Sequence, residues 1–169
     1  LCSNGPCRIT PKSPRGVCGA DADTIVARNF LRAVAAGSGC YVHVVENTAW
    51  NLLNIAKGQG DLKIKSPETL NQLAEAFGIE EEDLNKKAVK VAETVLNDLY
   101  KPKFQKMELV KKLAYGPRIE NWEKNGILPG GAKSEVFDAV VKTSTNLNSD
   151  PVDMLLNALT LGVSTGIYG

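Results

Sequence analysis

Three cysteines lie close together at the start of the chain. Cys2 and Cys7 are separated by four residues, Cys18 follows after ten more, and the segment around them is rich in glycine and proline. The last cysteine, Cys40, comes twenty-two residues after Cys18. Thiolates bind soft metals and take part in redox reactions. The cluster therefore predicts metal or redox chemistry, and it leaves open where a fourth ligand would come from.

Four interpretations of the cysteines compete. A disulfide is not expected, because no secretory signal is visible and disulfide scaffolds belong to oxidising compartments. Structural zinc sites use pairs of thiols two to four residues apart, and a second pair is absent from this sequence. Inert buried thiols are common in cores. The fourth interpretation is an iron–sulfur cluster, which needs cysteines carried by a loop that can wrap an inorganic core.

The loop that carries the cysteines favours the iron–sulfur interpretation. Gly5, Gly16 and Gly19 would let the backbone approach the cluster, and backbone N–H groups could donate to its sulfur atoms. The spacings do not match the common ferredoxin runs. Cys40 is a candidate fourth ligand, but its position within a long helical pattern favours a buried core thiol.

Composition places the chain among ordinary globular domains. The 169 residues, of which 43% are hydrophobic, suffice for one domain with its own core. A net charge of +1 gives no sign of nucleic-acid binding. No apolar run approaches the roughly 20 residues that a membrane span needs. A cytoplasmic protein is therefore expected.

Hydrophobic residues recur at helical spacing along the rest of the chain, which predicts an all-α fold: an irregular multi-helix bundle behind a cysteine-, glycine- and proline-rich loop at residues 1–20. Residues 1–169 are expected to form one helical domain. A single long helix begins at Asp21 or Asp23. Further helices are expected at residues 66–77, 83–100, 107–114, around 119–122, 134–145 and from 151 onward.

One apolar stripe defines a face of the long helix, and it contains Val26, Phe30, Ala33, Gly37, Cys40 or Tyr41, Val44, Thr48, Leu52 and Ile55. Gly37 and Gly39 are expected to permit a kink or a close approach by something bulky. The helix at residues 134–145 is expected to pack through Val136, Phe137, Val140 and Val141.

Several other residues have both a functional and a structural interpretation. His43, the only histidine, could carry protons near neutral pH or simply be a satisfied helix residue. Arg28 and Arg32 could offset the charge of a cluster, as could Arg8 and Arg15, or the helix arginines could pair with acids such as Asp21. The run PGGAKSE lacks the spacing of a phosphate-binding loop and is interpreted as a turn before a capped helix.

The segment CSNGPCRITPKSPRGVCGADADTIVARNFLRAVAAG resembles the cluster-binding segment of anaerobic nickel–iron–sulfur carbon monoxide dehydrogenases. LAYGPRIENW, ILPGGAKSEVFDAVVKTSTNLNSDPVDMLL and LGVSTGIYG are similar to the rest of the N-terminal helical domain of that family. The run AAGSGCYVHVVENTAWN is similar to the form that pairs with acetyl-CoA synthase in acetogens.

The resemblance implies that Cys2, Cys7 and Cys18 are three of the four ligands of a [4Fe-4S] cluster. The fourth ligand would lie just before Leu1, so the chain is expected to be part of a longer polypeptide. Thiols for a cluster shared across a homodimer would also lie upstream. Two Rossmann-like domains that hold the nickel–iron–sulfur site would follow Gly169, and no nickel ligand of the family maps onto this chain.

The resemblance also implies an activity for the longer protein: CO and water become CO2, two protons and two electrons, reversibly. This segment would relay electrons toward ferredoxin, and CO would pass to acetyl-CoA synthase. The 169 residues alone are expected to be inactive, and His43 is a candidate proton relay. The alternative is a non-enzymatic helical domain with structural or zinc-bound cysteines.

Overall fold

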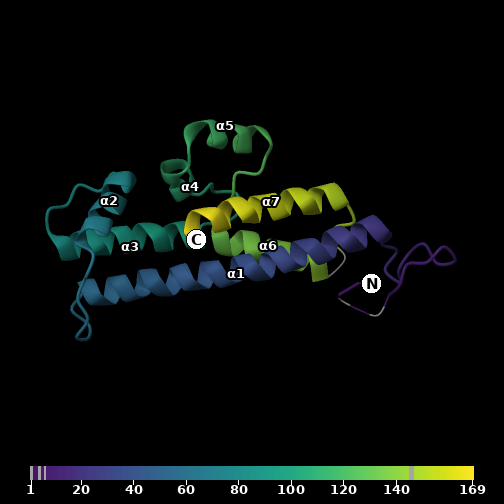
Figure 1. Ribbon diagram of the computed structural model, residues 1–169, viewed down its shortest axis with the longest axis horizontal. Helices are drawn as coiled ribbons and strands as arrows, with labels where there is room; N and C mark the ends of the chain where they lie inside the picture. The colour runs from purple at the N-terminus through teal and green to yellow at the C-terminus, as the bar shows by residue number, and fades with distance from the viewer. Residues whose placement is uncertain (1, 4, 6, 145–146) are drawn as a thin grey trace.

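The computed structural model describes residues 2–3, 5, 7–144 and 147–169, and every regular element in that part of the chain is a helix, as predicted. The helices are α1 (Ala22–Ala56), α2 (Pro67–Phe77), α3 (Leu84–Tyr100), α4 (Glu108–Leu113), α5 (Gly116–Lys124), α6 (Ala132–Ser144) and α7 (Pro151–Tyr168). Figure 1 shows α1 running along the helical part of the molecule, with α3, α6 and α7 against it. The N-terminal loop lies at one end and α2 at the other.

Aspartates begin three of the helices, because a carboxylate can accept the free N–H groups of a first turn. Asp21 accepts from Thr24 N at 2.9 Å, and Asp83 accepts from Lys86 N at 2.8 Å. Asp150 accepts from Val152 N at 2.8 Å, one residue after the N-terminal proline of α7. These caps confirm the helix starts predicted at Asp21 and Asp83 and the start of the last helix at Pro151.

Apolar side chains from α1 fill two parts of the core. Near its start, α1 packs Leu31 against α6 and α7, together with Met154 and Leu161. Near its end, α1 packs Leu53 against α3 and α4. Complete burial of a leucine such as Leu31 contributes roughly 2 kcal/mol of transfer free energy. The loop at the start of the chain is therefore attached to a helix that is anchored along its whole length.

The predicted apolar stripe of α1 is wrong as a description of its core face. Phe30 and Val44 are 51% and 60% exposed, whereas the buried face carries Leu31 and Val42. Cys40 is exposed as well, which contradicts its interpretation as a buried core thiol. A Cβ at Gly37 would meet nothing within 4 Å, so the expected close approach by a bulky group is absent there. The helix is apolar on more than one side, so periodicity alone did not distinguish the two faces.

The packing face of α6 also differs from the prediction. Phe137, Val140 and Val141 are exposed, and Val136 alone of the predicted set packs against the core. Alanines take their place: Ala139 of α6 belongs to the same buried cluster as Ala35 of α1. Small side chains at the contact let the axes of α1 and α6 approach closely. The larger side chains of α6 lie on the other, exposed side of the helix.

The segment before α6 is irregular main chain at residues 127–131, where a turn was predicted for PGGAKSE. The Glu135 side chain accepts a hydrogen bond from Gly130 N at 2.8 Å. A Cβ at Gly131 would overlap the backbone carbonyl of Lys101, so the glycines allow two segments of main chain to touch. The motif therefore has a structural explanation.

Among the helices of the described residues, none combines the length and apolar character that crossing a bilayer requires.

Candidate functional site

The cysteine loop, defined here as residues 2–20, contains backbone hydrogen bonds between residues that are close in sequence. Cys2 N donates to Cys7 O at 3.3 Å, and Gly16 N donates to Ala20 O at 2.8 Å. Gly19 has a φ of 84°, a conformation that glycine adopts without strain. The turn at residues 16–20 leads directly into the N-cap of α1 at Asp21.

The loop brings two of its cysteines into the same region. A Cβ at Gly16 would lie 3.8 Å from Cys7 Sγ, so Cys7 packs beside the turn that carries Cys18. Cys2 and Cys7 are half-buried and Cys18 is exposed. All four cysteines of the chain are free thiols, which contradicts the disulfide alternative.

The first turns of α1 hold the loop near both of its ends. Arg28 Nη1 donates to Cys18 Sγ at 3.7 Å. Asn29 Oδ1 accepts from both Ser3 N and Ser3 Oγ, at 3.0 and 2.7 Å, and Arg32 also donates to Ser3 Oγ. Cys18 and Ser3, the residue after Cys2, are therefore tied to adjacent positions of one helix, Arg28 and Asn29.

The end of α6 and the connection from α6 to α7 support these arginines from a third direction. Arg28 Nη2 donates to Asn148 O at 3.4 Å, and Arg32 donates to Thr143 O. Thr24 Oγ1 donates to Ser149 O at 3.0 Å, which fixes the same connection to the start of α1. Three segments distant in sequence thus meet at the side of α1 that faces the cysteines.

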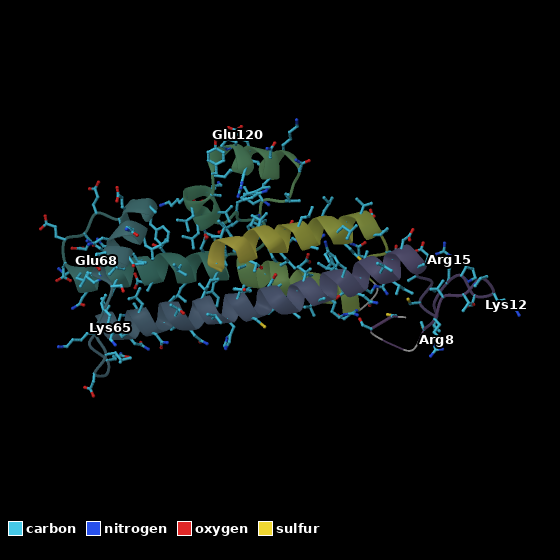
Figure 2. All side chains as sticks on the ribbon, viewed as in Figure 1. Arg8, Lys12, Arg15, Lys65, Glu68 and Glu120 are labelled. Carbon is cyan, nitrogen blue, oxygen red and sulfur yellow. The ribbon has the colours of Figure 1, made fainter. Side chains whose placement is uncertain are left out.

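Hydrogen bonding and charge make the loop favourable for anionic sulfur. The backbone N–H of Ala20, and then the Arg28 guanidinium, hold the pKa of Cys18 below its ordinary value. Arg15 Nη1 donates to the carbonyl of Gly19, the residue after Cys18, at 2.8 Å. Figure 2 shows Arg8, Lys12 and Arg15 on the loop, where all three are exposed. The surroundings are therefore positive.

The donor set fits an iron–sulfur cluster. Cys2, Cys7 and Cys18 supply three free thiols on a glycine-containing loop. Within the described residues, no three His, Cys, Asp or Glu side chains surround one point closely enough to hold a metal ion. Gathering the three thiols around one group therefore requires the loop to close further around it.

Cys40 and His43 lie well away from the loop. Cys40 is eighteen residues into α1, so it is roughly 27 Å along the helix axis from Ala22. That separation removes Cys40 as a fourth ligand for a site at the loop. His43 is exposed, and its Nε2 lies 3.1 Å from Asn47 Nδ2. The structure does not bring His43 near the cysteines of the loop.

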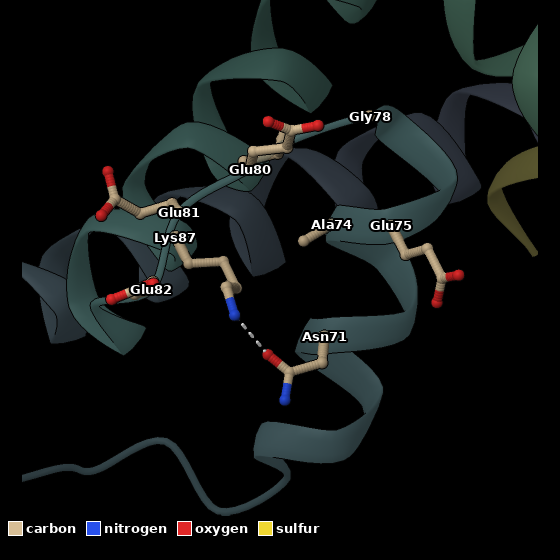
Figure 3. Close-up of a pocket in the computed structure, with 9 residues that line it drawn as sticks. Asn71, Ala74, Glu75, Gly78, Glu80, Glu81, Glu82 and Lys87 are labelled. Carbon is tan, nitrogen blue, oxygen red and sulfur yellow. Dashed lines mark hydrogen bonds between the residues drawn. The ribbon is translucent and has the colours of Figure 1, made fainter.

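A pocket of about 750 Å³ lies at the opposite end of the molecule, between α2 and the start of α3. Figure 3 shows Glu80, Glu81 and Glu82 beside it, and Lys87 Nζ donates to Asn71 Oδ1 at 2.7 Å. The pocket is lined by none of the residues that the sequence suggested as metal ligands or proton carriers.

The supporting residues of the loop were only partly foreseen. The sequence suggested charge compensation by Arg28 and Arg32, and the structure places both beside the loop. Asn29 and Asn148 were missed. Arginines four residues apart on a helix that begins just after a cysteine are a signal that could have found the pair, but the contact with Asn148 joins residues 120 apart in sequence.

Comparison with known proteins gives a consistent result over the whole chain. The model of the Prismane/CO dehydrogenase family matches residues 1–169. A protein of Methanocaldococcus jannaschii named carbon monoxide dehydrogenase is 55% identical over 170 residues, which cover 100% of this chain and 27% of that protein. The chain thus spans about a quarter of the length of this relative.

Solved structures agree. A Ni-free carbon monoxide dehydrogenase from Thermococcus sp. AM4 superposes with a TM-score of 0.90 at 35% identity, covering 98% of this chain and 27% of the other. A structure of acetyl-CoA synthase/carbon monoxide dehydrogenase, described with NiZn[Fe4S4] and NiNi[Fe4S4] clusters in its alpha subunits, gives a TM-score of 0.91 at 25% identity. It covers 99% of this chain and 26% of the other.

Proposed function

Because the chain belongs to the Prismane/CO dehydrogenase family, we propose that it is the electron-relay segment of a carbon monoxide dehydrogenase. The longer protein would convert CO and water to CO2, two protons and two electrons, reversibly. The match of the family over residues 1–169 is the observation that carries this proposal. The nickel–iron–sulfur site would lie in Rossmann-like domains outside these residues.

Cys2, Cys7 and Cys18 would hold a [4Fe-4S] cluster, with a fourth thiolate from a residue before Leu1. Their free state and their glycine-containing loop support this assignment. Such a cluster accepts and releases one electron at a time. The tie between Ser3 and Asn29 fixes the chain next to Cys2. The turn at residues 16–20 fixes Cys18 at the start of α1.

The partners proposed for the whole protein follow from the same family. Ferredoxin would accept the electrons, acetyl-CoA synthase would take the CO, and the protein would act as a cytoplasmic homodimer with a further cluster shared between its subunits. The positive surface at Arg8, Lys12 and Arg15 suits an acidic electron carrier. The similarity to an acetyl-CoA synthase/carbon monoxide dehydrogenase structure supports the synthase.

The exposed apolar faces support a larger assembly. Phe30 and Val44 of α1 and Phe137 of α6 are each more than half exposed, and contiguous exposed apolar surface is typical of interfaces. The relative from Methanocaldococcus jannaschii is nearly four times as long as this chain. The remainder of the polypeptide would cover these faces. His43, exposed on α1, stays a candidate proton relay within that assembly.

The test is CO-dependent reduction of a viologen dye by the full-length protein, purified without oxygen and analysed for metals. The proposal predicts CO oxidation and the presence of iron and nickel. Stoichiometric zinc without iron, together with no CO oxidation, would instead support a helical domain with structural cysteines.

A further inference from the structure

Arg28 of α1 combines burial with a direct contact to one of the proposed ligands. Its side chain is only 3% exposed, yet Nη1 lies 3.7 Å from Cys18 Sγ. An arginine stays protonated in proteins, so this position carries a permanent positive charge. Removing that charge from water is costly, and anionic or carbonyl partners offset the cost.

The second terminal nitrogen of the guanidinium is held by a different segment of the chain. Nη2 donates to Asn148 O at 3.4 Å, and the connection that carries Asn148 is tied to α1 again through Thr24 and Ser149. The guanidinium is planar and rigid, so holding one terminal nitrogen also fixes the direction in which the other terminal nitrogen donates. The contact with Cys18 is therefore oriented by the fold.

We propose that Arg28 is a positioning residue that raises the reduction potential of the cluster bound through Cys18. This inference rests on the proposed function. Reduction adds one negative charge to the cluster, and a hydrogen bond and a fixed positive charge at a ligand sulfur stabilise the reduced form more than the oxidised form. Because Arg28 is shielded from solvent, its effect is screened less than that of the exposed arginines of the loop.

Arg15 provides a matched control within the same loop. It carries the same charge, but it is exposed and its Nη1 donates to the backbone carbonyl of Gly19, the residue after Cys18, rather than to sulfur. Replacing Arg15 by glutamine removes as much formal charge as the same replacement at Arg28. The two variants differ in the contact with sulfur and in burial.

The experiment is a redox titration of the full-length protein, purified without oxygen and followed by electron paramagnetic resonance. The signal that is lost or altered in Cys18→Ser identifies the cluster concerned. Arg28→Gln is expected to move the midpoint of that signal to a more negative potential. The midpoint of Arg28→Lys should lie between those of the unmodified protein and Arg28→Gln, because lysine keeps the positive charge. Arg15→Gln should move the midpoint less than Arg28→Gln does.

The outcomes are distinguishable. An unchanged midpoint in Arg28→Gln with full iron content would overturn the inference, as would equal shifts in Arg28→Gln and Arg15→Gln. Loss of iron from both Arg28→Gln and Arg28→Lys, with iron retained in Arg15→Gln, would also contradict it, because the residue would then serve only the folding of the loop. Absence of iron from the unmodified protein would instead reject the proposed function.

Discussion

The carboxylate of Asp98, in the last turns of α3, accepts a hydrogen bond from the backbone N–H of Glu108 at 2.9 Å. Its other oxygen accepts from Leu109 N at 3.0 Å, and Lys101 Nζ lies 2.7 Å from the oxygen that accepts from Glu108. Asp98 is 1% exposed. A side chain of α3 thus caps the first turn of α4, which has no cap of its own at Met107.

Replacing Asp98 by asparagine should lower the free energy of unfolding of the 169-residue chain by roughly 2–3 kcal/mol. Asparagine keeps one acceptor and loses the charge that both N–H groups and Lys101 contact. Chemical denaturation followed by circular dichroism measures the change. Asp61→Asn, in the exposed segment before α2, is the control and should change stability little. Equal stability of the two variants would show that the buried cap is unimportant.

Gly131 should tolerate no side chain. Its Cβ would overlap the Lys101 carbonyl, which belongs to the backbone and has little freedom to move. We expect Gly131→Ala to destabilise the chain by about 2 kcal/mol or more, within the range of overpacking. Thermal unfolding provides the measurement.

A glycine in the middle of α7 is the matched control for that substitution. Gly162 faces a groove of about 730 Å³ between α5 and α7, and a Cβ there meets nothing within 4 Å. Gly162→Ala should therefore stabilise the isolated chain by about 0.5–1 kcal/mol through helix propensity. If both alanine variants changed stability by the same amount, contact with the Lys101 backbone would not explain why position 131 requires glycine.

The Glu46–Lys133 pair should make a small, pH-dependent contribution. Lys133 Nζ lies 2.7 Å from Glu46 Oε1 and 4.5 Å from the centre of the Tyr100 ring. The hydrogen bond from Lys133, and then that from Tyr100, lower the pKa of Glu46 from 4.5. The contribution is therefore present above pH 4.5 and is lost as the pH falls through the lower value of the folded state.

A double-mutant cycle with Glu46→Gln and Lys133→Met should give a coupling of roughly 0.5 kcal/mol at neutral pH, because the pair is partly exposed. The coupling should disappear in acid. Glu68→Gln, on the exposed face of α2, makes the same chemical change without a lysine partner. Its effect on the free energy of unfolding should not depend on pH in this way. A coupling that persists below the titration of Glu46 would argue against an ionic origin.

The sequence predicted the helices well because their ends carry local signals. Asp21, Asp83 and Gly78 mark starts and an end through bonds to residues within four positions, and such contacts can be inferred from the chain itself. Pro151 marks the last helix in the same way. Local chemistry therefore decided where the helices lie.

The faces of the helices were not predictable in the same way. α1 and α6 are apolar on several sides, and the structure buries Ala35 and Ala139 while Phe30 and Phe137 remain exposed. Close packing between small residues depends on which helices meet, which is a property of the tertiary fold. The prediction of Cys40 as a core thiol was wrong for that reason.

For the candidate site, the sequence supplied the ligands but not their support. Three thiols on a short loop are visible in the sequence, and arginines on the following helix are visible as well. The contact of Arg28 with the α6–α7 connection and that of Arg32 with the end of α6 join residues more than 100 positions apart, so no local pattern reveals them.

The central claim is that Cys2, Cys7 and Cys18 bind an iron–sulfur cluster. The most direct measurement is the iron content and visible absorption of full-length Cys7→Ser, purified without oxygen beside the unmodified protein, with Cys40→Ser as the control. The claim predicts that Cys7→Ser loses up to about four iron atoms per subunit, with the matching part of the absorption, and that Cys40→Ser loses none. Unchanged iron and absorption in Cys7→Ser, Cys2→Ser and Cys18→Ser alike would contradict it.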